Sequence, residues 1–137
     1  MINTLLFSVL LAWSHIAAVP TGPEHNSIEA APKADSLVAW QTEQDHDFGE
    51  IPRGKPVTFV FTFKNTDSAP ISIETVRTTC GCTAAEWTQD AILPGETGQI
   101  SIEYDAYKSG AFRKKIKVFF DRQKKGETLW IRGEVEG

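Results

Sequence analysis

Alternation of apolar and polar residues dominates the chain after residue 36. The clearest case is the segment 57–64, where Val57, Phe59, Phe61 and Phe63 recur at every second position. Successive side chains of a strand point to opposite faces, so this period predicts a half-buried strand with its aromatic residues inward. Six further strands are predicted: a first strand that begins at 37–40 and is followed by 47–51, and then 71–76, 84–88, 100–104, 112–120 and 129–135.

Turn-forming residues separate these segments and set the fold class. Proline, glycine, asparagine and aspartate gather at 52–56, 65–70, 93–98, 105–110 and 121–127. About seven strands in about 100 residues predict an all-β fold, an immunoglobulin-like antiparallel β-sandwich. A small closed barrel is the structural alternative. The apolar phase changes between Ile73 and Val76, which predicts a β-bulge there.

The first 36 residues lack this alternation. Residues 1–18 hold an apolar run too short for a membrane span of about 20 residues, and it ends in small residues typical of a signal-peptide cleavage site. The absence of Lys or Arg before the run indicates a weak signal or a start codon assigned too far downstream. Residues 19–36 carry three prolines and are predicted to form a flexible linker to the domain at 37–137. We therefore expect an exported protein, periplasmic or extracellular at the cell surface, with no membrane span after signal cleavage.

Composition narrows the function classes. Hydrophobic residues make up 41% and charged residues 23% of the 137-residue chain, which is typical of one globular domain. A net charge of −4 gives no general attraction to nucleic acid.

The only two cysteines flank a single glycine, in Cys80-Gly81-Cys82. Residues i and i+2 of extended chain share a face, but their Cα atoms lie about 6.6–7.2 Å apart, so a disulfide requires a bend at Gly81. Such a tight bridge is of the easily reduced kind. The pair is thus a redox or disulfide candidate, with free thiols and a two-thiolate metal site as alternatives. The simplest alternative is two small buried residues at a strand end, with Gly81 in a bulge.

Other chemistry finds little support. His15, His25 and His46 lie outside or at the edge of the predicted domain, so two thiolates would leave a zinc site half filled. The acidic residues Glu43, Asp45, Asp47 and Glu50 have the oxygen ligands of a calcium site, although a solvated acidic rim explains them more simply. We expect no catalytic site, no metal and no cofactor.

Basic residues concentrate near the C-terminus of an otherwise acidic chain. The candidates for contact with an anionic partner are Arg113, Lys115, Lys117, Arg122, Lys124 and Lys125. Such a stripe suits an acidic protein surface, a polysaccharide or lipid headgroups. The alternative is that charged residues protect an exposed sheet edge from aggregation.

Several motifs in a fixed order resemble the bacterial family called domain of unknown function 1573. They are Phe48-Gly49-Glu50-Ile51, Phe59 to Thr66, Thr79-Cys80-Gly81-Cys82-Thr83, Pro94-Gly95-Glu96, and Tyr104-Asp105 followed by Gly110. The resemblance implies an immunoglobulin-like, PapD-like sandwich in exported bacterial proteins, and similar sandwiches act mainly as interaction modules. We therefore expect an exported, non-enzymatic module that mediates protein or cell-surface interactions, its partner unknown. The alternative is a thiol-redox or metal-handling protein that uses Cys80 and Cys82.

Overall fold

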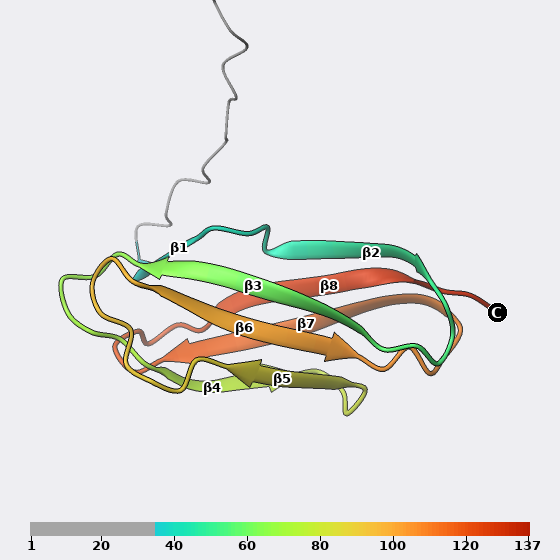
Figure 1. The fold of residues 1–137 in the computed structure, drawn as a ribbon. Helices are drawn as coiled ribbons and strands as arrows, with labels where there is room; N and C mark the ends of the chain where they lie inside the picture. The colour runs from blue at the N-terminus through green and yellow to red at the C-terminus, as the bar shows by residue number, and fades with distance from the viewer. Residues whose placement is uncertain (1–34) are drawn as a thin grey trace, which may run out of the picture.

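The structure is a computed structural model, and it describes residues 35–137. This part of the chain forms strands and turns without a helix (Figure 1). The predicted signal peptide and all but the end of the predicted linker lie outside the described residues. The eight strands are β1 (Val38–Trp40), β2 (Asp45–Ile51), β3 (Val57–Asn65), β4 (Ile73–Thr78), β5 (Thr83–Trp87), β6 (Thr97–Tyr104), β7 (Gly110–Phe120) and β8 (Glu127–Val135).

The strands form two four-stranded sheets. One sheet has the order β1-β3-β6-β5 and the other has the order β2-β8-β7-β4. All neighbouring strands are antiparallel except β2 and β8, which are parallel. The predicted immunoglobulin-like sandwich is confirmed, and the closed barrel is wrong because each sheet ends in two edge strands. The strand count rises to eight because 38–40 and 45–51 join different sheets.

The alternating residues meet between the two layers as the pattern predicts. Phe61 and Phe63 of β3 are fully buried, as are Ile100 and Ile102 of the neighbouring β6. Phe63 reaches across to Phe120 of the other sheet, with the two ring centroids 5.2 Å apart. Burying each such side chain contributes about 1.5–3 kcal/mol, so this layer supplies most of the stability. The bulge expected between Ile73 and Val76 is also present, as a register shift between Ile73 and Thr75.

A buried asparagine ties the end of β3 to the turn before β6. Asn65 is 1% exposed, and its side-chain amide donates to the carbonyls of Ala69 and Ile92 at 3.0 and 2.9 Å. Its side-chain oxygen accepts from the Asp67 backbone N–H at 2.8 Å. Its own backbone bonds to Gly95 and Glu96 of that turn. Two motifs that lie about thirty residues apart in the sequence are therefore one structural unit.

Candidate functional site

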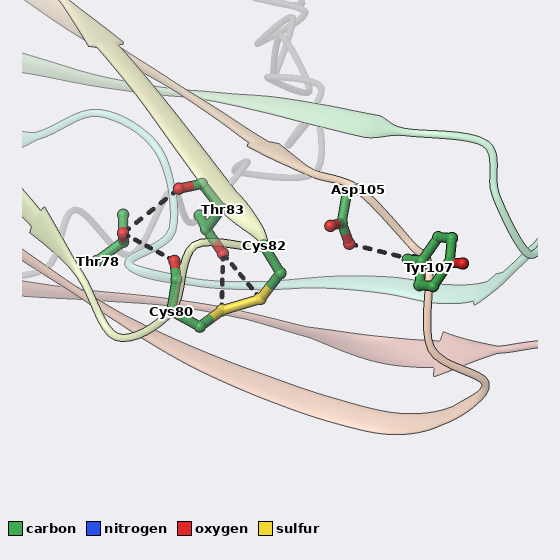
Figure 2. Close-up of a disulfide and its surroundings, with 6 residues drawn as sticks. All are labelled: Thr78, Cys80, Cys82, Thr83, Asp105 and Tyr107. Atoms are coloured by element: carbon green, nitrogen blue, oxygen red, sulfur yellow. Dashed lines mark hydrogen bonds between the residues drawn. A yellow bond between two sulfur atoms is a disulfide. The ribbon is translucent and has the colours of Figure 1, made fainter.

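The Cys80-Gly81-Cys82 segment forms the connection between the two sheets at one end of the sandwich. β4 of one sheet ends at Thr78, and β5 of the other begins at Thr83, so the cysteines lie in the turn between them. The Cα atoms of Cys80 and Cys82 are 5.3 Å apart, closer than extended chain allows, and the sulfur atoms lie at bonding distance (Figure 2). Figure 2 draws the two sulfurs as bonded, and formation of this disulfide in the protein in solution stays a prediction.

The expectation that the bend relies on the freedom of glycine is wrong for Gly81. Left-handed backbone occurs at Gly49, Gly54, Gly95 and Gly110 but not at Gly81. A Cβ atom added at Gly81 would meet nothing within 4 Å. The segment is a turn outside the strand ladders, so Gly81 serves no bulge either. A larger residue than glycine would therefore fit at this position.

Hydroxyl groups surround the cysteine turn. The hydroxyl of Thr83 lies 3.7 Å from the Cys80 sulfur and 3.9 Å from the Cys82 sulfur, as Figure 2 shows. The hydroxyl of Thr78 lies within reach of the carbonyls of Cys80 and Thr83, at 3.2 and 3.3 Å. The backbone N–H of Asp105 donates to the Cys82 carbonyl at 3.1 Å, which anchors the turn to the end of β6. Both sulfur-bearing residues are half-buried, and Gly81 between them is exposed.

The metal alternative gains no ligands from the fold. Within residues 35–137, no group of three or more His, Cys, Asp or Glu residues is placed to hold an ion. His46 lies on β2, at the opposite edge of its sheet from β4 and the cysteine turn. Its ring stacks on Phe59 with centroids 3.6 Å apart, and its Nδ1 bonds to Glu43. The histidine is therefore a packing residue far from the thiols.

The acidic residues near the start of the domain pair with cations. Asp45 contacts Arg113 at 2.9 Å and Arg132 at 3.5 Å, and Asp47 contacts Arg132 at 3.5 Å. They lie on β2 beside β8 and form the margin of a larger charged surface. This arrangement fits the acidic rim rather than the calcium site.

That surface is the outer face of the β2-β8-β7-β4 sheet. The strand register places Arg113 beside Arg132, Lys115 beside Trp130, and Lys117 beside Arg77. Residues two apart on a strand share a face, so these side chains form one continuous surface. We call it the cationic face and define it by Arg77, Arg113, Lys115, Lys117, Arg132 and the aromatic residues Phe119 and Trp130.

Two aromatic rings organise the cations of this face. The Arg113 guanidinium lies 4.0 Å from the ring centroid of Trp130, and the Lys115 amine lies 6.0 Å from the same ring. The Arg77 guanidinium lies 5.1 Å from the ring centroid of Phe119. A cation over an aromatic face gains about 0.5–1 kcal/mol at an exposed site. The rings therefore hold these charges along the sheet instead of leaving them free in solvent.

The fold divides the predicted basic stripe into two parts. Arg113, Lys115 and Lys117 lie on β7, whereas Arg122, Lys124 and Lys125 lie in the turn between β7 and β8. Arg122 donates to Asp67 at 3.0 Å, and that hydrogen bond, with one from the Ser68 backbone, lowers the pKa of the Asp67 carboxyl. Lys117 donates to the Gly126 carbonyl at 3.2 Å. Arg113 is matched by Asp45, so the charge without an acidic partner among the described residues centres on Arg77, Lys115 and Lys117.

The position of β7 argues against the alternative that its lysines protect a sheet edge from aggregation. β7 is an interior strand, bonded to β8 on one side and β4 on the other. Its backbone groups are already paired, so Lys115 and Lys117 protect no edge. Sequence analysis missed Arg77, Arg132 and Phe119 because their place on this face depends on the register between strands. In the sequence, only the alternation of Trp130 and Arg132 with the apolar residues of the last strand indicated that these two side chains point outward.

The fold is an immunoglobulin-like β-sandwich with a half-buried cysteine pair in the turn between its two sheets. The chain belongs to the family described as protein of unknown function, DUF1573, whose profile matches residues 39–135. The resemblance drawn from the motifs is thereby confirmed. No curated protein matches the sequence.

Solved structures agree on the fold. The ASH/PapD-like domain 7 of human CEP192 matches with a TM-score of 0.63 at 9% identity, covering 93% of this chain and 98% of that domain. A protein of unknown function from Porphyromonas gingivalis W83 matches with a TM-score of 0.59 at 17% identity, covering 76% of this chain and 50% of that one. The VesB protease of Vibrio cholerae matches with a TM-score of 0.58 at 15% identity, over 74% of this chain and 32% of the protease. The chain thus spans half or less of the length of these two bacterial proteins, and the matches concern the fold alone.

Among the described residues, no helix is long and apolar enough to cross a membrane.

Proposed function

We propose that this chain is an exported, non-enzymatic interaction module whose cationic face binds an acidic surface of a protein partner. The observation that carries the proposal is the interior position of β7, which leaves Lys115 and Lys117 without an edge to protect. Edge protection does not explain these two charges, so we propose that they serve binding.

The composition of the face favours a protein partner. Trp and Arg are the residues that most often dominate binding energy at protein interfaces, and Trp130 and Arg113 are in direct contact here. The face extends across three strands, with an open hollow of about 420 Å³ beside Arg113 and Arg132 at one side, and this broad surface suits a macromolecule better than a small substrate. Cations held by aromatic rings lose little side-chain entropy on binding. The carboxylates on β2 bound the surface on one side and leave the β7–β4 side the most positive.

The test compares two variants with the same change in net charge. The first replaces Arg77, Lys115 and Lys117 with Gln. The control replaces Lys55, Lys64 and Lys108 with Gln, three exposed lysines outside the cationic face. The full chain and both variants are eluted with salt from immobilised poly-glutamate, which presents carboxylates on a peptide, and from heparin.

We expect the first variant to lose retention on poly-glutamate while the control is retained like the natural protein. Each lost charge contact weakens binding to the column, so a lower salt concentration suffices to elute the variant. Equal elution of the two variants would show that retention follows net charge alone, and would refute the proposal. Retention on heparin but not on poly-glutamate would replace the protein partner with a polysaccharide.

A further inference from the structure

We propose that Cys80 and Cys82 form a reversible disulfide that exchanges with an external dithiol of a peptide or protein. This activity is independent of the cationic face, which lies on the outer surface of one sheet. The cysteines lie in the turn from β4 to β5, where neither belongs to a strand ladder. An attacking thiolate needs a line of approach to a sulfur, and the turn offers one because both cysteines are only half-buried and Gly81 between them is exposed.

Opening this bond leaves the fold in place. The sequence separation of the two cysteines is 2, and a bridge stabilises a fold less as the loop it closes becomes shorter. The hydrophobic core draws on both sheets, with fully buried residues such as Phe61, Ile100, Ile116 and Leu129, and needs no help from the bridge. The backbone bond from Asp105 to Cys82 and the bond from Thr83 to Cys80 hold the turn without it. The thiol and disulfide states are therefore both compatible with the folded domain.

The two sulfurs have different surroundings. Cys82 packs against the hydrophobic core, whereas Cys80 lies outside that cluster. We therefore assign the Cys80 sulfur, which does not pack against the core, as the one attacked, and the Cys82 sulfur as the leaving group. Thr83 is 6% exposed, and its hydroxyl has the two sulfurs as its only side-chain hydrogen-bond contacts among the described residues. A buried hydroxyl with no other partner is placed to donate to the thiolate as it forms.

The exchange balances without a cofactor. One thiolate of the external dithiol attacks the Cys80 sulfur, the Cys80–Cys82 bond breaks, and Cys82 leaves as a thiolate that takes up a proton. The second thiolate of the partner then attacks the partner's first sulfur, which is bonded to Cys80 in the mixed disulfide. Cys80 leaves as a thiolate and takes up a proton. Two electrons and two protons pass to the two cysteines, and the partner dithiol becomes a disulfide. The reverse direction oxidises the cysteines at the expense of a partner disulfide.

The first experiment treats the full chain with glutathione disulfide, removes it, and adds dithiothreitol in steps before thiol alkylation and intact-mass measurement. We expect no alkylation before reductant and two alkyl groups after it, with tryptophan fluorescence and the far-UV spectrum unchanged. Two alkylated thiols after the glutathione disulfide step would overturn the proposal, because no bond would form. A bond that resists dithiothreitol until the protein is unfolded would overturn it as well, because the pair would be structural.

Three substitutions test the assigned roles in the folded protein. We expect Cys82→Ser, which keeps the Cys80 sulfur, to react several-fold faster with an aromatic disulfide reagent than Cys80→Ser. Thr83→Val should slow reduction of the bridge by dithiothreitol about two- to tenfold, the loss expected for one hydrogen bond. Thr79→Val alters an exposed neighbour with no bond to sulfur and serves as the control, with no change expected. Equal rates for Thr83→Val and Thr79→Val would refute the role of the hydroxyl, and a faster Cys80→Ser would reverse the assignment of the attacked sulfur.

Discussion

Replacement of Asn65 by Ala should destabilise the domain more than any other single change to a polar side chain described above. The substitution removes both amide donors and the acceptor oxygen from a site that is 1% exposed. The Ile92 carbonyl keeps its bond from the Ile71 backbone N–H but loses the buried side-chain donor, at a net cost of about 0.5–1.5 kcal/mol. The bonds to Ala69 and Asp67 are only partly buried, so water can replace them at a net loss of about 0.5–1.5 kcal/mol each. The expected loss for the three bonds is about 1.5–4.5 kcal/mol, a large share of the stability of a small domain.

Urea unfolding followed by tryptophan fluorescence measures this loss. We expect a lower midpoint at an unchanged slope, because the surface exposed on unfolding stays the same. Thr66→Ala is the matched control. Its hydroxyl bonds to the Leu37 carbonyl from an exposed position, so its removal should cost about 1 kcal/mol or less. A loss for Asn65→Ala no larger than that of the control would refute the view that this asparagine joins β3 to the turn before β6.

Three further predictions concern glycine packing and pH. Gly98→Ala should destabilise the domain by about 1–3 kcal/mol, because the added Cβ would overlap the buried ring of Phe63. Gly81→Ala should be nearly neutral, because its Cβ would meet nothing. Urea unfolding tests both variants, and equal midpoints would contradict the packing argument. Burial, with a smaller effect of Asp105, raises the pKa of the Tyr104 hydroxyl, so the unfolded chain ionises first and stability should fall above about pH 10. Tyr104→Phe should flatten that fall in thermal melts. The pKa of Asp67 is lowered in the folded state, so its carboxylate stabilises the fold at neutral pH and this contribution should be lost below about pH 4. The melting temperature of Asp67→Asn should therefore fall less in acid than that of the natural protein.

The fold was largely predictable because the alternation of apolar and polar residues in each strand indicates which of its side chains are buried. The segment 57–64 alternates strictly, and its inward residues Phe61 and Phe63 are buried as expected. The same holds for the inward residues of β6, β7 and β8. Burial with a period of two is a local property, so a single sequence suffices to locate such strands.

The neighbours of each strand were not predictable in the same way. Local pattern does not tell which strand lies beside β7, so the pairing of Lys117 with Arg77 came only with the structure. Asn65 was assigned to a turn because asparagine favours turns, yet it ends β3 in a buried position that Ile92 and Ala69 make favourable. The cysteine segment was treated as extended chain, and the need to pass from one sheet to the other made it a turn instead.

The parallel pairing of β2 with β8 determines when the domain can be completed during synthesis. β2 is made before β3 to β8, but it occupies an edge whose single neighbour is β8, the last of the eight described strands. Closing that pair requires contact between the two ends of the described chain, which gives the fold a high contact order and favours slow folding. A nascent chain that stops before residue 127 would hold β2 unpaired and would leave one side of β7 open to strands of other molecules. Synthesis must therefore pass β8 before this sandwich is protected from aggregation.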